Sequence, residues 1–325
     1  MYHRGHLRPQ DLESFAKQAF GTGYRPVKTE RLYGGAQKVI YKVDFANGFA
    51  CLLYVWDLSQ NYFQEEIEDA DAPSWNSYGA NLFAANQAFL KQNGIRTAAL
   101  YAMNRERTQY PFDYAFVEFI AGPKLEAYLD DASPRSEPLM EQLSDLLRRM
   151  HGLRRETYGP VDGCEDQLIP CHRYQLMNAL RQLDYAAQHV ASVAAHREQL
   201  IQRMHDLEQQ IKPRQNYGLV HGELGPDHLL VKNDAELCLI DIEGASFYDV
   251  EHEHGFLRLR FGSWYRHLQD DALDADRLAF YQLHHYISCT SGGLKLLQRG
   301  FRDEALARKI FEHNLRSALA FIGRS

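Results

Sequence analysis

The sequence is poor in the features that mark secreted, membrane-spanning and nucleic-acid-binding proteins. Its five cysteines are odd in number and scattered, so they form no disulfide framework and indicate a reducing compartment. No run of eighteen apolar residues occurs, and the opening stretch MYHRGHLRPQDLESF contains no apolar signal region. No block of five basic residues occurs either, and the net charge of -7 argues against a nucleic-acid partner. We therefore expect a cytoplasmic protein that contacts neither membrane nor nucleic acid.

The composition itself is typical of a globular protein. Hydrophobic residues make up 45% and charged residues 24% of the 325 positions. The chain has no internal repeat and no low-complexity segment. Its length suits one large domain or two lobes of roughly 100–200 residues each, with a core of ordinary size.

The first part of the chain, residues 1–120, has the patterns of a small β-rich lobe. Apolar and polar residues alternate over 39–45, and Asn47-Gly48 is a hairpin signal before an almost wholly apolar strand over 49–56. The other elements that we expect are helices over 11–20 and 77–92 and strands near 98–103 and 114–119. Ala121-Gly122-Pro123 then breaks the pattern, and we place the boundary between two lobes there.

The second part, residues 121–325, has mostly helical periodicity. Apolar residues recur at helical spacing over 137–151, and long amphipathic patterns cover 174–211 and the chain from 249 onward. The exception is a small predicted hairpin, in which the strands 229–231 and 237–240 flank a turn. The two parts together predict an α+β protein with a β-rich N-lobe and a larger helical C-lobe.

The stretch LVHGELGPDHLLVKNDAELCLIDIEGASFYD, residues 219–249, groups several polar side chains around short apolar strands. Phosphoryl transfer needs a carboxylate near the attacking hydroxyl group and metal ligands that bridge the phosphates. Protein kinases supply them as His-Arg-Asp, an Asn five residues after that Asp, and a second Asp after a strand. Here His221-Gly222-Glu223, then His228, and then Asp241 after an apolar strand follow the same order and spacing.

This stretch resembles the aminoglycoside phosphotransferase family, which has a two-lobe protein-kinase-like fold. The resemblance is carried by the His-Gly-acid turn, by Leu224-Gly225-Pro226 after it, and by His228 in place of Asn. Three further segments resemble the family's turn after the N-lobe helix, its hinge, and a helix followed by a loop: 94–97, 116–122 and 147–159. The resemblance covers roughly residues 32–260.

The resemblance implies a Mg²⁺-dependent enzyme that moves the γ-phosphate of ATP or GTP to a hydroxyl group of a small-molecule acceptor. An aminoglycoside or another amine-bearing compound is the kind of acceptor that it suggests. Glu223 would orient the acceptor hydroxyl and take up its proton, while His228 and Asp241 would hold metal, so we expect the three side chains to converge on one cation. Glu243 would point the same way as Asp241 in an extended chain and is a second candidate ligand.

The resemblance also implies supporting roles around this site. The hinge backbone of Glu118–Ile120 would hold the purine, and His221 would act structurally within its loop. Asp249 would anchor the catalytic loop from the start of the next helix, although a simple helix cap is an alternative. Glu251 and Glu253 would suit an amine-bearing acceptor, and solvation of a helix surface explains them equally well.

Three departures from the family pattern accompany the resemblance. Glu223 stands where the loop Asp is expected, and its extra methylene group moves the carboxylate by about 1 Å, a displacement that can slow catalysis. Tyr54 stands in the strand position where a Lys would hold the phosphates. The predicted helix 77–92 contains no acidic residue to pair with such a Lys; it offers Asn81, Asn86 and Gln87. Because an unpaired carboxylate would be costly there, the two losses together indicate a rebuilt phosphate site.

Positive charge in a rebuilt site would come from Lys38 or Lys42, which lie on the presumed loop and strand over the nucleotide. Gly34-Gly35 would let the backbone approach a phosphate closely, although a plain hairpin explains two glycines as well.

Rival interpretations remain open for the site and for the function. His228 would be a satisfied core histidine if it bound no metal. A zinc site on His252 and His254 is disfavoured, because residues two apart do not share a helix face. The whole chain would be a non-catalytic, pseudokinase-like protein that binds nucleotide or another ligand if Tyr54 and Glu223 had abolished turnover. Nucleotidyl transfer is a third hypothesis.

Overall fold

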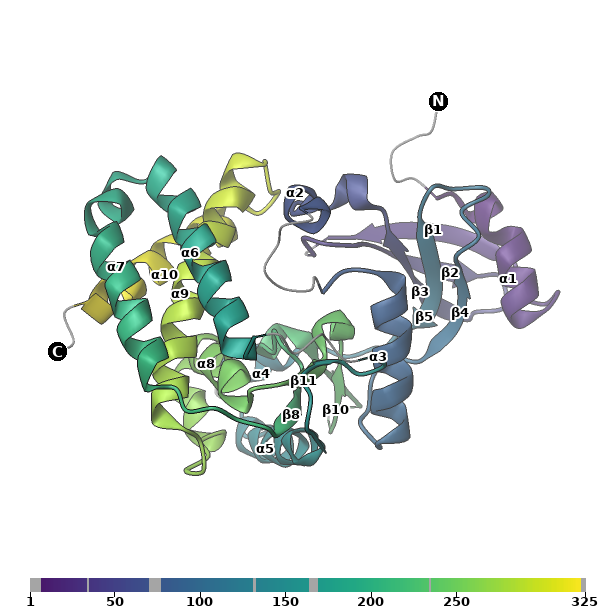
Figure 1. The fold of residues 1–325 in the computed structure, drawn as a ribbon. Coiled ribbons are helices and arrows are strands. Elements are labelled where there is room, and N and C mark those ends of the chain that lie inside the picture. The colour runs from purple at the N-terminus through teal and green to yellow at the C-terminus, as the bar shows by residue number, and fades with distance from the viewer. Residues whose placement is uncertain are drawn as a thin grey trace. The chain divides into compact units, whose positions relative to one another are not determined.

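The computed structural model describes residues 7–33, 35–69, 77–130, 133–163, 169–233 and 235–322 (Figure 1). Within these residues the chain forms two compact units. The first contains residues up to 69, 77–123 and 230–243, and the second contains 124–229 and 244 onward. The first unit gives way to the second directly after the Ala121-Gly122-Pro123 break, and it also includes a hairpin from much later in the sequence.

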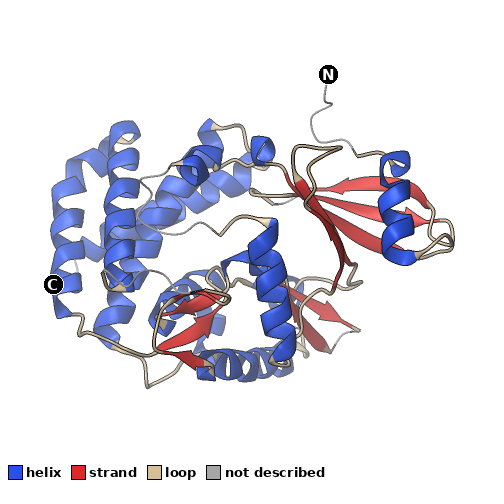
Figure 2. Cartoon of the chain, turned by 45° about the vertical axis from the view of Figure 1, so that its right-hand side comes forward, coloured by secondary structure: helices blue, strands red, loops and turns tan. Residues whose placement is uncertain are grey.

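The first unit is built on a five-stranded antiparallel sheet, drawn in red in Figure 2. The strand order is β1-β2-β3-β5-β4. The strands are β1 (Pro26–Leu32), β2 (Val39–Phe45), β3 (Ala50–Trp56), β4 (Leu100–Asn104) and β5 (Asp113–Glu118). Burial alternates along β2 as its sequence predicts, and Gly48 takes a positive φ of 82° in the β2–β3 hairpin. The almost wholly apolar β3 lies between β2 and β5, so both of its edges are paired, and five of its seven residues are buried.

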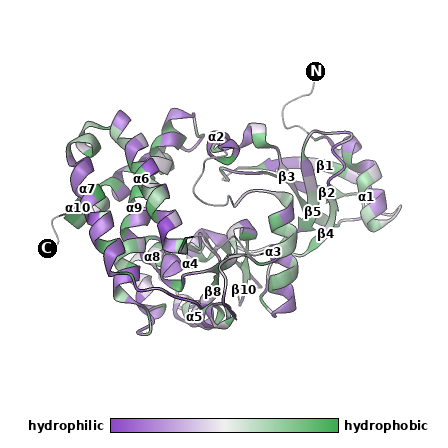
Figure 3. Cartoon of the chain, in the orientation of Figure 1, coloured by the Kyte–Doolittle hydropathy of each residue, from purple (hydrophilic) through white to green (hydrophobic). Residues whose placement is uncertain are grey.

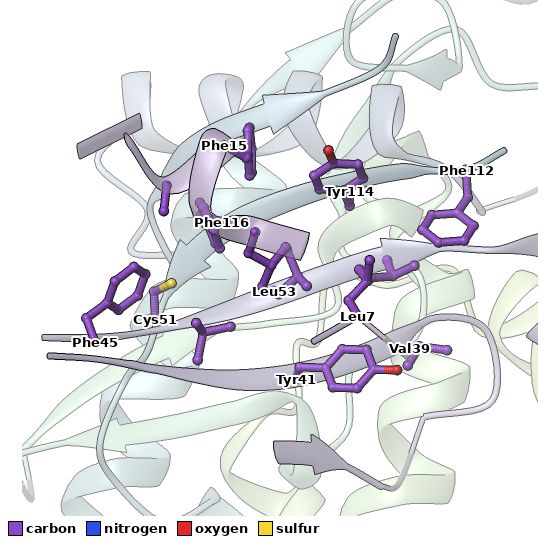
Figure 4. Packing of buried hydrophobic residues seen from close by; sticks show 14 residues of the cluster. Leu7, Phe15, Val39, Tyr41, Phe45, Cys51, Leu53, Phe112, Tyr114 and Phe116 are labelled. Carbon is purple, nitrogen blue, oxygen red and sulfur yellow. The ribbon is translucent and has the colours of Figure 1, made fainter. Parts of the chain in front are cut away.

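Helix α1 (Glu13–Phe20) packs on this sheet through aromatic side chains (Figure 4). Phe15 stacks on Phe116 of β5 with ring centroids 4.6 Å apart and meets Tyr114 edge-on at 5.0 Å. A second helix, α3 (Ala80–Gln92), begins three residues later than its apolar pattern predicts. Gly79 precedes it with a φ of 133°, which lies outside the helical region, so the helix starts after this residue. The unit also contains the short helix α2 (Gln64–Glu68).

The late hairpin is joined to the first unit by backbone hydrogen bonds. It consists of β9 (Leu229–Lys232) and β10 (Glu236–Leu239), which pair as predicted. The Val231 N–H donates to the Pro123 carbonyl at 2.9 Å, and the Leu239 N–H donates to the Arg96 carbonyl at 3.0 Å. A Cβ atom on Gly122 would lie only 2.1 Å from the Val231 carbonyl oxygen, so only glycine allows this approach.

The second unit is mostly helical, as its periodicity predicts. Its helices are α4 (Leu125–Asp130), α5 (Ser136–Gly152), α6 (Cys171–His189), α7 (Ala191–Gln210), α8 (Val250–Phe261), α9 (Ala275–Gln298) and α10 (Glu304–Ile322). A small sheet of order β6-β8-β11-β7 joins Arg154–Arg155, Tyr217–Val220, Ser246–Tyr248 and Gly159–Pro160. The long pattern over 174–211 is divided in two by the extended residue Val190.

Helix α9 is the centre of the second unit and packs against α6, α7, α8 and α10. Hydrophilic and hydrophobic residues alternate in patches along α6, α7 and α9 in Figure 3, as in amphipathic helices that bury one face. Along the described stretches, none of the helices combines the length and the apolar character that crossing a bilayer requires.

Candidate active site

A partly buried cluster of charged side chains in the first unit joins the loop before β2 to the segment after β10. The Lys38 ammonium group contacts the carboxylate of Asp241 and lies 2.7 Å from Oε1 of Glu243. The side chains of Lys38 and Glu243 are each 7% exposed, whereas that of Asp241 is 41% exposed. Burial alone would lower the pKa of Lys38, but the negative charges of Asp241 and Glu243 outweigh it and raise that pKa. Lys38 is therefore charged, and Lys42 is not part of the cluster.

Tyr54, at the position where the resemblance predicts a strand lysine, and α3 pack beside Lys38 and the acidic segment. The Lys38 ammonium lies 5.1 Å from the centre of the Tyr54 ring, a cation–π contact. Tyr54 also packs edge-on against Phe83 of α3 at 5.4 Å. Asn86, one of the amides noted in the sequence, is fully buried and donates to the carbonyls of Ile242 and Glu243 at 2.7 and 3.1 Å. An amide therefore connects α3 to the acidic segment without adding a charge.

The acidic segment has features of a metal site. Asp241 has a φ of 60°, a left-handed conformation that is uncommon outside glycine and that is frequent at functional sites. Oε1 of Glu243 accepts from Lys38 and from the Trp56 indole N–H at 3.2 Å. Its Oε2 atom is buried and has no hydrogen-bond partner among the described residues. Burial also raises the pKa of Glu243, although the positive charge of Lys38 acts to lower it. Two carboxylates with a buried oxygen still to be satisfied are suitable ligands for Mg²⁺.

The other residues of the predicted nucleotide site have separate surroundings. Lys42 pairs with Asp44 of its own strand at 3.0 Å, and its ammonium lies 5.1 Å from the Phe119 ring. Gly35 is exposed, and a Cβ there would only reach ordinary contact with the Lys38 carbonyl. Gly34 lies outside the described residues.

The predicted hinge is held in place by the side chain of Glu118, the last residue of β5. Its carboxylate accepts from Arg96 at 2.6 Å, from the Ala99 N–H at 3.1 Å and from Lys232 at 3.4 Å. Burial would raise the pKa of Glu118, but Arg96 and the other donors lower it. Ile120 is buried. The hinge is thus anchored by a side chain, and its backbone follows directly after β5.

The predicted catalytic loop lies in the second unit, between β8 and β9. Gly222 has a φ of 95°, and a Cβ there would come within 2.9 Å of the Gly244 carbonyl oxygen, so the position between His221 and Glu223 requires glycine. His221 is fully buried and Glu223 is exposed. His228 follows in a short 3₁₀ turn, where its Nδ1 atom lies 2.8 Å from the Glu223 carbonyl. The structure therefore brings Glu223 and His228 together through the backbone of the loop.

Glu253 of α8 holds this loop in place. Its Oε1 atom accepts from the backbone N–H groups of His221 and Gly222 at 2.9 and 3.2 Å, and its Oε2 atom lies 2.9 Å from Nε2 of His151. Burial would raise the pKa of Glu253, but the hydrogen bond and charge of His151 lower it. Glu253 is completely buried, which argues against the acceptor-binding role that we expected. A carboxylate with these partners positions the loop instead.

Asp249 and Glu251 belong to a second buried network. Asp249 makes no side-chain cap to α8; its carboxylate accepts from Arg277 and Tyr281 at 2.6 Å each and from Arg214 at 3.3 Å. Glu251 receives two parallel bonds from Arg214, at 2.6 and 2.7 Å. Glu251 is 2% exposed, so its expected contact with an acceptor is also disfavoured. The capping alternative for Asp249 is wrong, and its contacts connect α8 to α9.

Comparison with known proteins identifies the family. The profile of the phosphotransferase enzyme family matches residues 70–287, more than half of the chain. The chain belongs to this family. The predicted resemblance is thereby confirmed. A search of curated proteins found no match.

Solved structures of phosphotransferases share the fold of this family member. The crystal structure of a putative aminoglycoside phosphotransferase from Ralstonia eutropha is 14% identical, with a TM-score of 0.67 over 98% of each chain. Spectinomycin phosphotransferase APH(9)-Ia in complex with ADP and spectinomycin is 15% identical, with a TM-score of 0.63 over 97% of this chain and 98% of that one. Choline kinase LicA from Streptococcus pneumoniae is 12% identical, with a TM-score of 0.62 over 97% and 99%. The predicted protein-kinase-like fold is confirmed.

Sequence reasoning missed some of the site residues. The contacts of Glu253 with the loop backbone and of Trp56 with Glu243 have no signal in the sequence. Asn86 did have a signal in the sequence, because it is one of the few polar residues of a predicted helix that contains no acidic residue.

Proposed function

We propose that this protein is a Mg²⁺-dependent phosphotransferase that moves the γ-phosphate of ATP or GTP to a hydroxyl group of a small molecule. The observation that carries the proposal is the partly buried cluster of Lys38, Asp241 and Glu243. A pure scaffold gains little from two carboxylates and an ammonium group in one half-buried place, because burying charge costs free energy. A site for Mg²⁺ and phosphate uses all three.

Lys38 replaces the lysine that β3 lacks. It reaches the acidic segment from the loop before β2 and rests on Tyr54, which occupies the vacated position. Lys38 would hold phosphate oxygens of the nucleotide, and its raised pKa keeps it positively charged at neutral pH. Asn86 connects α3 to the acidic segment through a neutral amide. The positive charge of Lys38 is therefore shared only with the two carboxylates and the nucleotide.

Asp241 and Glu243 would hold Mg²⁺, with His228 as a further candidate ligand. Mg²⁺ bound there would neutralise charge on the phosphates. Asp241 is partly exposed and so accessible to a ligand, and Glu243 has a buried oxygen atom still to be satisfied. Neutral imidazole is a weaker ligand for this ion than carboxylate, so the two acidic residues carry this part of the proposal.

Glu223 would orient the acceptor hydroxyl group and accept its proton. It is exposed at the tip of a loop whose backbone is fixed by Glu253, so its carboxylate is accessible to a second substrate. The structures of relatives in complex with spectinomycin or hygromycin B support a small-molecule acceptor. Because Glu251 and Glu253 are buried, they give no reason to restrict this acceptor to amines.

A non-catalytic nucleotide-binding protein is the second candidate, favoured by Tyr54 and by Glu223 in place of Asp. Turnover of Mg²⁺-ATP and Mg²⁺-GTP, measured with a panel of hydroxyl-bearing acceptors, separates the two. We expect turnover that Asp241→Asn abolishes and that Asp44→Asn, on the partly exposed side of β2, leaves intact. Nucleotide binding without turnover for every acceptor would favour the second candidate, and absence of nucleotide binding would exclude both.

A further inference from the structure

Three histidines in the second unit form a cluster apart from the candidate active site. His252 of α8 faces His284 and His285 of α9, and one ring nitrogen of each lies within 4.8 Å of the others. The ring centres of His252 and His285 are 4.6 Å apart, and those of His284 and His285 are 5.0 Å apart. His284 and His285 are 3% and 5% exposed, while His252 is partly exposed.

His254 does not belong to this cluster. Its Nδ1 atom lies 3.0 Å from the Tyr265 hydroxyl, and its ring lies 5.2 Å from that of His151. Residues 252 and 254 therefore face different neighbours, as their spacing in a helix predicts. His252 and His254 therefore do not share a zinc site, as we expected. His252 instead lies beside two histidines of α9.

Hydrogen bonding leaves ring nitrogens of the cluster without partners. Nδ1 of His252 and Nδ1 of His284 are buried and have no hydrogen-bond partner in the part of the chain that the structure describes. A buried nitrogen atom without a partner costs free energy, and a bound cation would satisfy its lone pair. Burial also lowers the pKa of His285 to about 4 and that of His252 and His284 well below 6.5, so all three rings are neutral at pH 7, as metal ligands must be.

The second nitrogen atom of His285 has the partner that is typical of a metal ligand. Nε2 of His285 lies 2.7 Å from the backbone carbonyl of His252. Since a carbonyl only accepts, Nε2 carries the proton and donates it, and the lone pair of His285 is on Nδ1. Histidines that bind metals generally donate their other N–H to a carbonyl or carboxylate in this way. Nε2 of His284 lies 3.4 Å from the Ser288 hydroxyl and 3.5 Å from Nδ2 of Asn178. Donation from Nε2 to Ser288 leaves the lone pair of His284 on Nδ1, whereas a bond from the Asn178 amide leaves it on Nε2.

We propose that His252, His284 and His285 bind a divalent transition metal ion, with Zn²⁺ as the best match. Imidazole nitrogen suits zinc, copper and nickel and is a poor ligand for Mg²⁺. Tetrahedral zinc with bonds of 2.0–2.1 Å needs ligand atoms about 3.4 Å apart, so nitrogen atoms that now lie within 4.8 Å approach by up to about 1.4 Å on binding. Three histidines leave the fourth position of the ion to water or another small ligand.

The ion would connect α8 to α9. Helix α9 is the central helix of its unit, and α8 carries Glu253, which holds the catalytic loop. Binding to the folded protein alone stabilises it by mass action, so zinc raises the unfolding temperature of the chain. This site is separate from the proposed phosphotransferase function, and either can hold without the other.

Zinc binding to the full-length chain tests the proposal directly. The chain is freed of metal with a chelator and titrated with Zn²⁺ in excess Mg²⁺, against a chromophoric zinc indicator. We expect one zinc ion for each chain, a higher unfolding temperature with zinc, and visible absorption bands of tetrahedral geometry when Co²⁺ replaces it. Loss of affinity of roughly 10–100-fold or more is expected in His284→Gln and in His252→Phe, which keeps a ring but no nitrogen.

Two control variants make the result decisive. His313→Gln changes an exposed histidine on α10 and is expected to bind zinc like the unchanged chain. Asp241→Asn removes a ligand of the proposed magnesium site and is also expected to retain zinc. Circular dichroism without metal shows whether the variants are folded. Absence of zinc binding by the unchanged chain, or zinc that is lost with Asp241→Asn and kept in His284→Gln, would overturn the proposal.

Discussion

Nζ of Lys38 lies 2.7 Å from Oε1 of Glu243, although 205 positions separate them in the chain. In the proposed function this pair takes the place of the one expected from a lysine on β3, although Lys38 lies on the loop that precedes β2. The contact makes Lys38 the centre of the site, so its substitution has the largest expected effect on nucleotide turnover.

Lys38→Met is expected to lower nucleotide turnover by about 10²–10³-fold, since the charge that holds phosphate oxygens is lost. The matched variant Lys42→Met removes a lysine that pairs with Asp44 on its own strand, and it should retain turnover. Lys38→Met also leaves Glu243 without its cation, which costs about 3–5 kcal/mol of unfolding free energy. The double variant Lys38→Met, Glu243→Gln should regain much of that stability but should not regain turnover. Equal loss of activity in both lysine variants would contradict the assignment.

Moving the lysine back to β3 is a stricter test of the same site. Because Lys38 lies over the ring of Tyr54, a lysine at position 54 can reach the same carboxylates. The double variant Tyr54→Lys, Lys38→Met should therefore recover part of the nucleotide affinity that Lys38→Met loses. Titration with a fluorescent ATP analogue and Mg²⁺ measures this without an acceptor. A folded double variant with no more affinity than Lys38→Met would show that position 54 is outside the phosphate site.

Gly122→Ala is expected to destabilise the protein by about 1–3 kcal/mol, because the added Cβ would collide with the backbone carbonyl of Val231. Gly152→Ala, at the end of α5, meets no atom within 4 Å and should be neutral or stabilise slightly. Urea denaturation of both variants provides the comparison. Similar stabilities would mean that the hinge and β9 are not in close contact in solution.

Glu253→Ala is expected to cost about 3–5 kcal/mol, because it leaves His151, the buried N–H of His221 and the partly buried N–H of Gly222 without their acceptor. Glu137→Ala removes an exposed carboxylate that pairs with Arg266 and should cost less than about 1 kcal/mol. Chemical denaturation compares their stabilities, and turnover measured without denaturant reports the position of Glu223. A Glu253 variant as stable as the Glu137 variant would show that the loop does not depend on Glu253.

Glu118 should make stability depend on pH in acid. Its pKa in the folded protein is lowered below the ordinary value of 4.5, so the unfolded chain binds the proton more readily. The stabilisation is therefore present above pH 4.5 and is lost as the pH falls through the lower, folded-state pKa. Glu118→Gln should be less stable than the unchanged protein at pH 7 and should show a flatter decline in acid. Parallel curves for the two proteins would contradict this role.

Much of the fold follows from local patterns in the sequence. Alternation over 39–45, the Asn47-Gly48 turn and the apolar run after it predict β2 and β3, because side-chain periodicity reports which face of a strand is buried. The boundaries are less well determined. Helix α3 starts at Ala80 and the pattern over 174–211 is divided at Val190, since backbone conformation at single residues decides where a helix begins or ends.

The sequence by itself determined the family, the two kinds of secondary structure and the positions of Glu223, His228 and Asp241 within one short segment, because these depend on residue type and spacing along the chain. Only the tertiary structure decided that Lys38 rather than Lys42 meets Glu243, that Glu253 is a buried support, and that His252 faces two histidines of α9. Such pairs lie far apart in the sequence, and the packing of whole elements against one another selects them.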